Sequence, residues 1–437
     1  MDNRDLICEN LSVNQDGVLC FAEQPTDQLA AQYGTPLYLM DEDRIRSNIR
    51  TYVTGMEKAF GQYGHVLYAS KAASFKRIYE IAAQEGIGID VVSCGEIATA
   101  VKAGFPLENA YFHSNNKTDD DIRYAMDKGI GYFVVDNQDE LYALNDIAGE
   151  LGIRQNLLLR ITPGIDPHTY AAVNTGTVDS KFGSAIETGQ AEAITKLALS
   201  LPHIQLQGFH CHVGSQVFDA QVPLQTAEIM VTFVRDMYEK LGFAAKKLDL
   251  GGGYGVRYTR NDPVIDIESN ILTVGKRVCY LIAQYGIPMP HIYMEPGRSI
   301  VADAGMTLYT MGTLKSIPGY KNYVSVDGGM TDNPRYLLYG SSYTLLAPTK
   351  MLEEKNMICS VVGRCCESGD VIQKDVRLPG TLKRGDLIAC LTTGAYNYSM
   401  ASNYNRVPRP AVVMLSGGSS YIAVKRETPD DITRLDV

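Results

Sequence analysis

HVLYASKA (65–72), GIDVVS (88–93), AYFHSN (110–115) and YFVVD (132–136) are short apolar runs rich in β-forming residues, and they start 23, 22 and 22 residues apart. Each interval has room for one strand, one helix and two short loops. The segments between the runs, such as 74–85, carry alanine, isoleucine and charged residues at helical spacing. This stretch therefore predicts a series of strand–helix units.

Four more runs continue the alternation towards the C-terminus. They are NLLLRITP (156–163), QLQGFHCHVG (205–214), KKLDLGGG (246–253) and HIYMEPG (291–297). Eight strands that alternate with helices favour an α/β fold of the (β/α)8 TIM-barrel type, with parallel strands inside and helices outside. An open, doubly wound sheet uses the same alternation and is the alternative.

The pattern changes after about residue 300, where helical periodicity mostly disappears. Short β-rich runs such as NYVSVDGG and DLIACLTT are separated by Gly, Asp and Pro turns, as in an all-β domain. The first 35 residues look similar and precede the barrel. We predict N-terminal strands at 1–35 that join the β-domain, a barrel at 36–303 and a C-terminal all-β domain at 304–437.

Charge and composition exclude several classes of function. The 437 residues include 40 Lys+Arg and 50 Asp+Glu, a formal net charge of −10, with no basic cluster. Nucleic acids and anionic membranes need such clusters, so neither is an expected partner. The start, MDNRDLICEN, does not resemble a signal peptide, and no apolar run approaches the roughly 20 residues that cross a bilayer. Nine scattered cysteines without a C-x-x-C pair argue against a disulfide scaffold, and the sequence predicts a soluble cytoplasmic protein.

Polar residues concentrate at the C-terminal ends of the predicted barrel strands, where barrel enzymes have their active sites. They are Lys71, Asp90, His113 to Asn115, Asp136, Arg160, His210, His212, Gly251 to Gly253, Glu295 and Arg298. Such a set is unusually polar for a pattern that forms a core. It gives no clean metal-binding geometry but suits a cofactor that carries a phosphate.

Lys71 ends the apolar run VLYASK. A lysine at a barrel mouth would lose contact with water, which lowers its pKa and makes the neutral, nucleophilic amine accessible. Covalent chemistry with an aldehyde requires that form of the amine. A lysine that extends its charged end to solvent is the structural alternative.

Two motifs after other strands point to a phosphate and to a heterocycle. GGGYG (251–255) does not match G-x-G-x-x-G, which disfavours a dinucleotide, but adjacent glycines let backbone N–H groups approach a phosphate. A plain tight turn is the alternative. In EPGR (295–298), a buried Glu295 facing a pyridine nitrogen would keep that nitrogen protonated. A structural ion pair between Glu295 and Arg298 is the alternative.

Histidine and cysteine motifs each allow two interpretations. His210 and His212 share a strand face, and H-x-H can bind zinc, but an obvious third ligand is missing. A flat imidazole beneath a planar ring is the competing role. CCESGD (365–370) pairs a thiol with a carboxylate, and a thiol can donate a proton to carbon. Small buried cysteines are also common in cores.

Six motifs occur in a characteristic order: YASKA, HVGSQ, GGGYG, EPGR, CESGD and GAYNYSMASNYN, with HSNNKT (113–118), SKFG (180–183) and VPRPA (407–411) between them. In this order the chain resembles the pyridoxal-phosphate-dependent decarboxylases that share the alanine racemase-like barrel, from about residue 30 to about residue 430. The resemblance implies a barrel with a C-terminal β-domain, pyridoxal 5′-phosphate as cofactor, an amino-acid substrate, and a homodimer with active sites at its interface.

The resemblance also implies roles for individual residues. Lys71 would hold the cofactor covalently, His212 would stack on its ring and Glu295 would pair with the ring nitrogen. The other residues implied to bind the cofactor are Asp90, Ser215, Gly252, Gly253, Gly297, Arg298 and Tyr396. Cys366 would donate a proton to Cα and, with Glu367, would come from the partner subunit. The residues implied to bind substrate are Arg298, Arg335, Tyr339, Glu367 and Tyr396.

Two positions depart from the family's pattern. Ala73 stands where the family usually has Asn, and Tyr336 stands where it commonly has Pro. Neither change removes a charged group, but the second leaves the loop geometry beside Arg335 open.

The implied reaction converts meso-2,6-diaminopimelate to L-lysine and CO2, the last step of lysine biosynthesis. Arg298, Arg335 and Glu367 would bind a substrate that has an amino-acid group at both ends, since guanidinium groups suit carboxylates. The nearest alternative is a decarboxylase of ornithine, lysine or arginine, for which Arg335 would have no clear purpose. A racemase is disfavoured by Glu295.

Two alternatives come from other classes of protein. A metal-dependent barrel hydrolase would use His210 and His212 as ligands, although no metal is expected here. A non-catalytic cofactor carrier would need only the barrel, and CCESGD in the β-domain argues against it.

Overall fold

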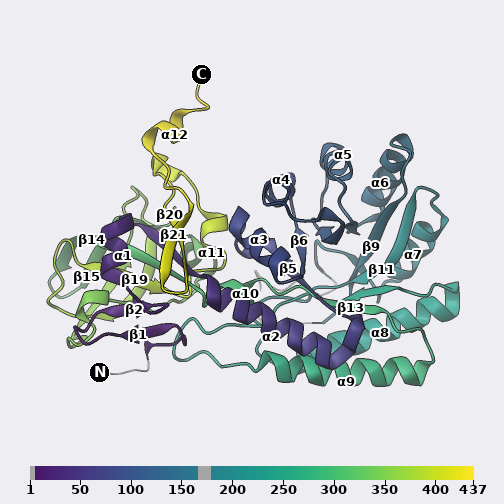
Figure 1. Ribbon diagram of the computed structural model, residues 1–437, viewed down its shortest axis with the longest axis horizontal. Coiled ribbons are helices and arrows are strands. Elements are labelled where there is room, and N and C mark those ends of the chain that lie inside the picture. The colour runs from purple at the N-terminus through teal and green to yellow at the C-terminus, as the bar shows by residue number, and fades with distance from the viewer. Residues whose placement is uncertain (1–4, 166–178) are drawn as a thin grey trace. The chain divides into compact units, whose positions relative to one another are not determined.

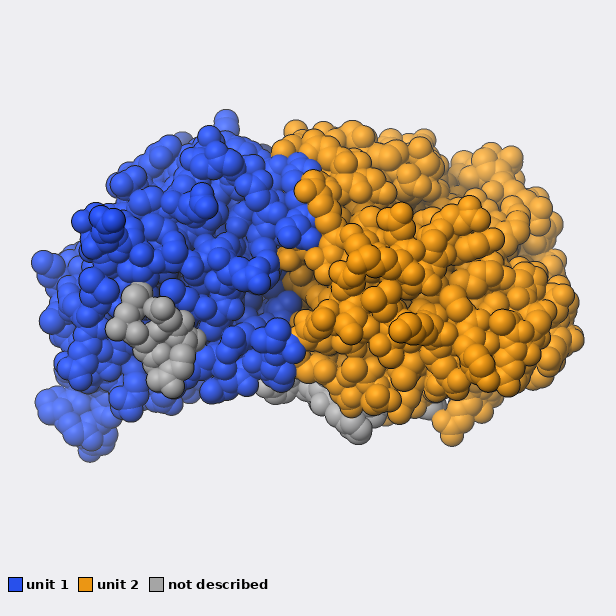
Figure 2. Space-filling view, turned by 60° about the horizontal axis from the view of Figure 1, so that its bottom comes forward, with its two compact units in different colours: residues 1–47, 256–264, 300–437 blue, residues 48–255, 265–299 orange. Residues whose placement is uncertain are grey.

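The computed structural model describes residues 5–165 and 179–437 and divides the chain into two compact units (Figures 1 and 2). The β-unit comprises 1–47, 256–264 and 300–437, and the barrel unit comprises 48–255 and 265–299. Residues 1–4 and 166–178 fall outside the described part. Among the described residues, no helix combines the length and apolar character that a membrane span needs.

Eight parallel strands of the barrel unit close on themselves. Their order is β9-β11-β12-β13-β5-β6-β7-β8, and β8 pairs again with β9. This closure confirms the predicted barrel and excludes the open sheet. The strands are β5 Gly64–Ala69, β6 Gly88–Val91, β7 Ala110–Phe112, β8 Tyr132–Val135, β9 Gln155–Thr162, β11 Ile204–His210, β12 Lys247–Asp249 and β13 His291–Met294, with the short β10 Ser184–Ala185 beside β9.

Helices follow the strands, as the sequence pattern predicts, and α8 and α9 lie side by side (Figure 1). Several begin at a polar cap: the Ser93 side chain accepts from the Glu96 N–H, and the Asn137 side chain accepts from the Glu140 N–H. The helices are α2 Glu42–Phe60, α3 Lys76–Gln84, α4 Cys94–Lys102, α5 Asp119–Asp127, α6 Gln138–Glu150, α7 Gln190–Ser200, α8 Gln221–Leu241, α9 Ile267–Tyr285 and α10 Arg298–Val301.

Side chains from several strands fill the barrel interior. A buried cluster contains Leu67, Tyr111, Val134, Leu158 and Tyr293, so the barrel is a packed core and not a pore. At the β11–β12 contact, a Cβ on Gly208 would lie 1.8 Å from the Lys247 carbonyl oxygen. Only glycine lets these two strands pair at this distance.

The β-unit is built on a mixed sheet with the order β18-β17-β15-β14-β4-β20-β21, and β19 pairs with both β14 and β16. Two apolar clusters pack against its strands. Its elements are α1 Thr26–Tyr33, β4 Leu37–Asp41, β14 Gly305–Ile317, β15 Lys321–Val326, α11 Arg335–Tyr339, β16 Leu345–Leu346, β17 Met357–Val362, β18 Val371–Leu378, β19 Leu387–Leu391, β20 Ala411–Ser416, β21 Ser419–Val424 and α12 Pro429–Thr433.

The first strands, β1 Leu11–Val13, β2 Leu19–Phe21 and β3 Gln24–Pro25, pair only with one another among the described strands, in a small antiparallel sheet of the same unit. The compact units differ from the predicted boundaries at 36–47, 256–264 and 300–303, which all belong to the β-unit. The first difference arises because β4 pairs with β14 and β20. The second arises because Tyr258 packs into the core of the β-unit.

Candidate active site

A buried polar cluster forms at the carboxyl ends of the barrel strands. Asp90 lies in β6, His113 follows β7, His210 ends β11 and Glu295 follows β13. His210 Nε2 lies 3.0 Å from Glu295 Oε2 in a hydrogen bond, and His113 Nε2 lies 2.9 Å from Glu295 Oε1. None of the four residues is more than 6% exposed. The structure thus brings together the predicted Asp90 and Glu295 with two histidines.

Several buried polar atoms in this cluster have no hydrogen-bond partner among the described residues. They are both carboxylate oxygens of Asp90, Nδ1 of His210 and Oδ2 of Asp249. A buried polar group without a partner costs roughly 1–3 kcal/mol. Their concentration at one place fits a polar ring bound there, since a protonated ring nitrogen can donate a hydrogen bond to the Glu295 carboxylate.

Glu295 is the anion of the cluster. Burial alone would raise the pKa of Glu295, but the neighbouring imidazoles of His113 and His210 hold it well below its ordinary value. Burial, with the neighbouring charge of Glu295, raises the pKa of Asp249 well above its ordinary value. Near neutral pH, Glu295 is therefore ionised, whereas Asp249 takes up a proton more readily than an ordinary carboxyl group.

Lys71 lies past the end of β5, in a 3-10 turn over Ser70–Ala72. Its Nζ is 3.9 Å from Asp90 Oδ2, and its side chain is 41% exposed. The prediction that Lys71 is shielded from water is wrong, because the strand ends at Ala69 and the turn leaves the side chain in contact with solvent. The amine is nevertheless beside the carboxylates of the cluster, and its solvent contact leaves it accessible to an aldehyde.

Glycine allows four backbone segments to pack closely beside this cluster. A Cβ on Gly252 would lie 2.1 Å from the Glu295 carbonyl oxygen, and a Cβ on Gly253 would lie 2.3 Å from that of Gly214. A Cβ on Gly297 would lie 2.9 Å from the Ala69 carbonyl oxygen. Glycine at these positions therefore lets the backbone segments pack closely, in an arrangement called the glycine cradle below. Adjacent glycines are also the kind of backbone whose N–H groups can approach a phosphate.

Charged and aromatic side chains flank the glycine cradle. Nε and Nη2 of Arg298 donate to Ser215 Oγ at 3.2 and 3.0 Å. The Gly252 N–H donates to His212 Nδ1 at 3.4 Å. Burial lowers the pKa of His212 well below its ordinary value, so its ring is uncharged at neutral pH. The structure thus places Ser215, Arg298 and His212 around the glycines.

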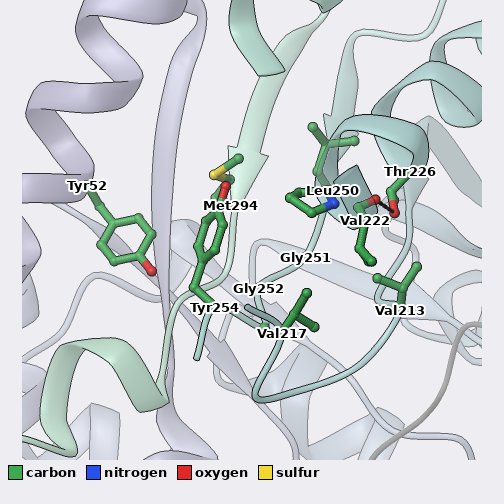
Figure 3. A pocket seen from close by; sticks show the side chains of 12 residues that line it. Tyr52, Val213, Val217, Val222, Thr226, Leu250, Gly251, Gly252, Tyr254 and Met294 are labelled. Carbon is green, nitrogen blue, oxygen red and sulfur yellow. Dashed lines mark hydrogen bonds between the residues drawn. The ribbon is translucent and has the colours of Figure 1, made fainter. Parts of the chain in front are cut away.

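Behind the cradle lies a cavity of about 30 Å³, close to the volume of one water molecule (Figure 3). Figure 3 shows Tyr52, Met294 and Tyr254 on one side and Val213, Val217 and Val222 on the other. The cavity is too small and too apolar for a cofactor. Its lining places Gly251 to Gly253 beside apolar side chains such as Val213, Val217 and Val222, and this packing holds the glycine loop in place.

The other predicted residues lie in the β-unit, and Arg335 is the most buried charged group among them. It begins α11 and is 5% exposed, and its Nη1 donates to Tyr258 Oη at 3.0 Å and to Tyr343 Oη at 3.1 Å. Its Nε has no hydrogen-bond partner among the described residues. The Tyr396 ring centroid lies 5.7 Å from the guanidinium carbon. Arg335 is therefore a buried cation surrounded by tyrosines.

Cys366, Glu367 and Tyr339 are on the surface of this unit. The Cys366 N–H donates to Asn405 Oδ1 at 2.8 Å, and Glu367 Oε1 accepts from the Gly369 N–H at 3.1 Å. Cys366 and Glu367 are exposed, and Tyr339 is 37% exposed. Two predicted substrate-binding groups are therefore accessible to another molecule.

Sequence reasoning missed Tyr258 and Tyr343, the partners of Arg335. Tyr343 lies eight residues after Arg335, but Tyr258 comes from a segment after the glycine motif, and no local signal joins it to Arg335. His113 lies at a predicted strand end, but the sequence assigns it no function. Its position does predict that it lies near the other polar strand ends, since the carboxyl ends of parallel strands meet at one end of a barrel.

The metal-dependent alternative grouped His210 with His212. In the described part of the chain, the one group of three ligand atoms within 4.8 Å of one another is His113, His210 and Glu295, without His212. His210 already bonds Glu295, while His212 faces the glycine loop. The two predicted ligands therefore contact different groups and do not face a common metal position.

Comparisons with known proteins show the family to which this chain is similar. Residues 46–302 match the family model described as "Pyridoxal-dependent decarboxylase, pyridoxal binding domain". A diaminopimelate decarboxylase of Bacillus subtilis is 44% identical over 97% of this chain and 96% of its own. A solved diaminopimelate decarboxylase of M. jannaschii in complex with L-lysine is 31% identical, with a TM-score of 0.90 over 98% of each chain. A Vibrio vulnificus lysine/ornithine decarboxylase complexed with putrescine is more distant, 25% identical with a TM-score of 0.75 over 90% of this chain and 97% of its own.

Proposed function

This chain belongs to the diaminopimelate decarboxylases, within the pyridoxal-dependent decarboxylase family, and from that membership we propose how its own residues carry out the reaction. It is a carboxy-lyase that uses pyridoxal 5′-phosphate and converts meso-2,6-diaminopimelate to L-lysine and CO2, the last step of lysine biosynthesis. Such a reaction needs groups that hold the cofactor, groups that bind both ends of the substrate and a proton donor for Cα.

The cluster and cradle of the barrel unit would hold the cofactor. Lys71 would bind its aldehyde carbon, Glu295 would accept from its ring nitrogen and His212 would face its ring. When bound, the cofactor accepts the electron pair that remains on Cα after CO2 departs. Phosphate contacts would come from backbone and side-chain donors at Ser215, Gly252, Gly253, Gly297, Arg298 and Tyr396, with Asp90 beside Lys71. The unpartnered buried atoms of the cluster are the observation that supports this assignment.

Arg335 would select the substrate by its distal carboxylate. It is a buried guanidinium whose Nε–H has no acceptor among the residues described, and a carboxylate is the acceptor that suits it best. Tyr339 and Tyr396 would line the same region, and Glu367 would bind the distal ammonium. Ornithine and lysine lack a distal carboxylate, so they would leave Arg335 buried without an anion.

A selectivity assay tests this assignment. The wild-type protein should form lysine from diaminopimelate faster than it decarboxylates lysine, ornithine or arginine. Arg335→Met should lower kcat/KM for diaminopimelate by roughly 10- to 150-fold, the equivalent of losing about 1.5–3 kcal/mol of charged hydrogen bonding, and should change the other substrates little. Arg377→Met removes an exposed arginine of the same unit and serves as the control. Faster turnover of ornithine or lysine by the wild type would reverse the choice of substrate.

We also propose that the protein is a homodimer in which Cys366 and Glu367 of the partner subunit complete each active site. The exposure of both residues supports this. Cys366 would donate the proton that Cα receives once CO2 has left, and its thiol proton would be replaced from solvent. The nine unpaired cysteines support a cytoplasmic location, where thiols stay reduced.

Subunit complementation tests the shared site. Lys71→Ala and Cys366→Ala proteins should each be nearly inactive, but their co-expression should restore about a quarter of wild-type activity. Half of the dimers then combine one chain of each kind, and each of these has one intact site. Co-expression of Lys71→Ala with Glu295→Gln is the control and should restore nothing, because both residues belong to the barrel of one subunit and neither mixed site has both of them. Equal recovery in both mixtures, or recovery in neither while dimers form, would place Cys366 in its own subunit's site.

A further inference from the structure

Three carboxyl groups are buried together at the end of the barrel, and their surroundings differ. Asp90, Asp249 and Glu295 are 1%, 0% and 6% exposed. Burial in a medium of low dielectric constant makes it costly to ionise all three at once. A reaction that needs a negative charge at one defined point therefore needs neighbouring groups that stabilise the ionised form of one particular carboxyl group.

Only Glu295 has an imidazole at each of its oxygens. His210 Nε2 is 3.0 Å from one oxygen and His113 Nε2 is 2.9 Å from the other. Asp249 is bonded instead by the backbone N–H of Gly251 at 2.8 Å. Asp90 lies 3.9 Å from both His113 Nε2 and Lys71 Nζ.

The two imidazoles reach Glu295 from separate strands. His113 follows β7 and His210 ends β11, while Glu295 follows β13. The rings stand edge to face, with centroids 4.8 Å apart and an interplanar angle of 74°. Both histidines are at most 5% exposed, so neither ring has room to swing away. The pair therefore fixes both the position and the rotation of the carboxylate.

We propose that His113 and His210 are positioning residues for the decarboxylation, which hold the Glu295 carboxylate in place facing the ring nitrogen of the cofactor. This inference rests on the proposed use of Glu295. His210 then orients the Glu295 carboxylate and does not bind a metal. His113, to which the sequence assigns no function, does the same from the other oxygen. Neither histidine is expected to contact the substrate.

The electrostatics of the cluster agree with this geometry. Burial lowers the pKa of His210 to about 4, so near pH 7 its ring is neutral and can donate one N–H. Its Nδ1 has no hydrogen-bond partner among the described residues, which leaves Nε2 as the nitrogen that carries the proton towards Glu295. A neutral donor keeps Glu295 anionic without cancelling its charge, and that charge is what keeps a ring nitrogen protonated.

The test compares two polar replacements that differ in reach. A glutamine amide nitrogen lies near the position of histidine Nε2, whereas an asparagine amide is too short to reach it. His113→Asn and His210→Asn should therefore lose the contact with Glu295, and His113→Gln and His210→Gln should retain part of it. His291→Asn, at the amino end of the barrel in β13, is the matched control.

The primary readout is the 15N resonance of the ring nitrogen in holoenzyme loaded with labelled cofactor. In both asparagine variants the resonance should move towards that of an unprotonated nitrogen, and kcat should fall by roughly 10- to 100-fold, as happens when groups that orient a ligand are removed. The glutamine variants should keep the resonance closer to its wild-type position than the asparagine variants do, and His291→Asn should not change it.

Failure of this inference differs from failure of the proposed function. If the wild-type protein binds no pyridoxal phosphate, the proposed function itself fails. If every variant binds the cofactor at Lys71 and the 15N resonance stays at its wild-type position in His113→Asn and His210→Asn, the positioning role is wrong. The role is equally contradicted if the glutamine variants are as impaired as the asparagine variants.

Discussion

Lys71→Ala is expected to abolish both the visible absorbance of the bound cofactor and the formation of lysine from diaminopimelate. The Lys71 amine lies 3.9 Å from Asp90 Oδ2, beside the buried carboxylates, and 41% of its side chain meets solvent. An amine in this place can both bind the cofactor covalently and move protons at the reacting carbon. Its loss should lower kcat by at least roughly 10²- to 10⁴-fold, the range for removing a group that transfers protons.

Two further variants separate the covalent role of Lys71 from its charge. Lys71→Arg keeps a cation near Asp90 but lacks a nucleophilic amine, so it should be as inactive as Lys71→Ala. Lys76→Ala removes an exposed lysine at the start of α3 and should retain full activity. Normal turnover by Lys71→Arg would show that only the charge matters, which would contradict the covalent assignment.

Glu295→Gln should have the second-largest effect. The substitution keeps the shape of the side chain but removes the negative charge opposite the ring nitrogen, so the ring loses its power to accept electrons. The expected decrease in kcat is about 10²- to 10³-fold, comparable to removal of one group that stabilises transition-state charge. Cofactor binding should persist, because the lysine and the glycine cradle are unchanged, and absorbance measured after dialysis will check this.

Asp249→Asn is the matched comparison for Glu295→Gln. Asp249 is also fully buried, but burial and the nearby Glu295 charge raise its pKa well above its ordinary value, so a neutral amide should disturb it less than it disturbs Glu295. It should lose much less activity than Glu295→Gln. An equal loss in both variants would mean that the site needs both carboxylates charged, against the assignment of Glu295 as the anion that faces the ring nitrogen.

The barrel could be predicted from sequence because its pattern is local. Each strand–helix unit carries its own hydrophobic periodicity, and the intervals of 22 and 23 residues fix the length of a unit. The polar strand ends could also be predicted to meet, since parallel strands bring their carboxyl ends to the same end of a barrel. Asp90, His210 and Glu295 are therefore neighbours although they are far apart in the chain.

Contacts between distant segments could not be predicted in the same way. β4 lies early in the chain yet pairs with β14 and β20, and Tyr258 lies between barrel segments yet bonds Arg335 of the β-unit. No periodicity in the local sequence encodes such pairings. The solvent contact of Lys71 was missed for a related reason, because one turn beyond the strand end decides where its side chain lies.

Covalent attachment of the cofactor aldehyde to the Lys71 amine is the step on which every other assignment depends, and reduction with borohydride followed by peptide mapping tests it. The reagent makes the covalent link permanent, so the labelled peptide identifies the lysine involved. We predict one labelled peptide, which contains Lys71, and loss of the label when diaminopimelate is added before the reductant. Labelling at a different lysine, or no labelling of a protein saturated with pyridoxal phosphate, would contradict this attachment and the site built around it.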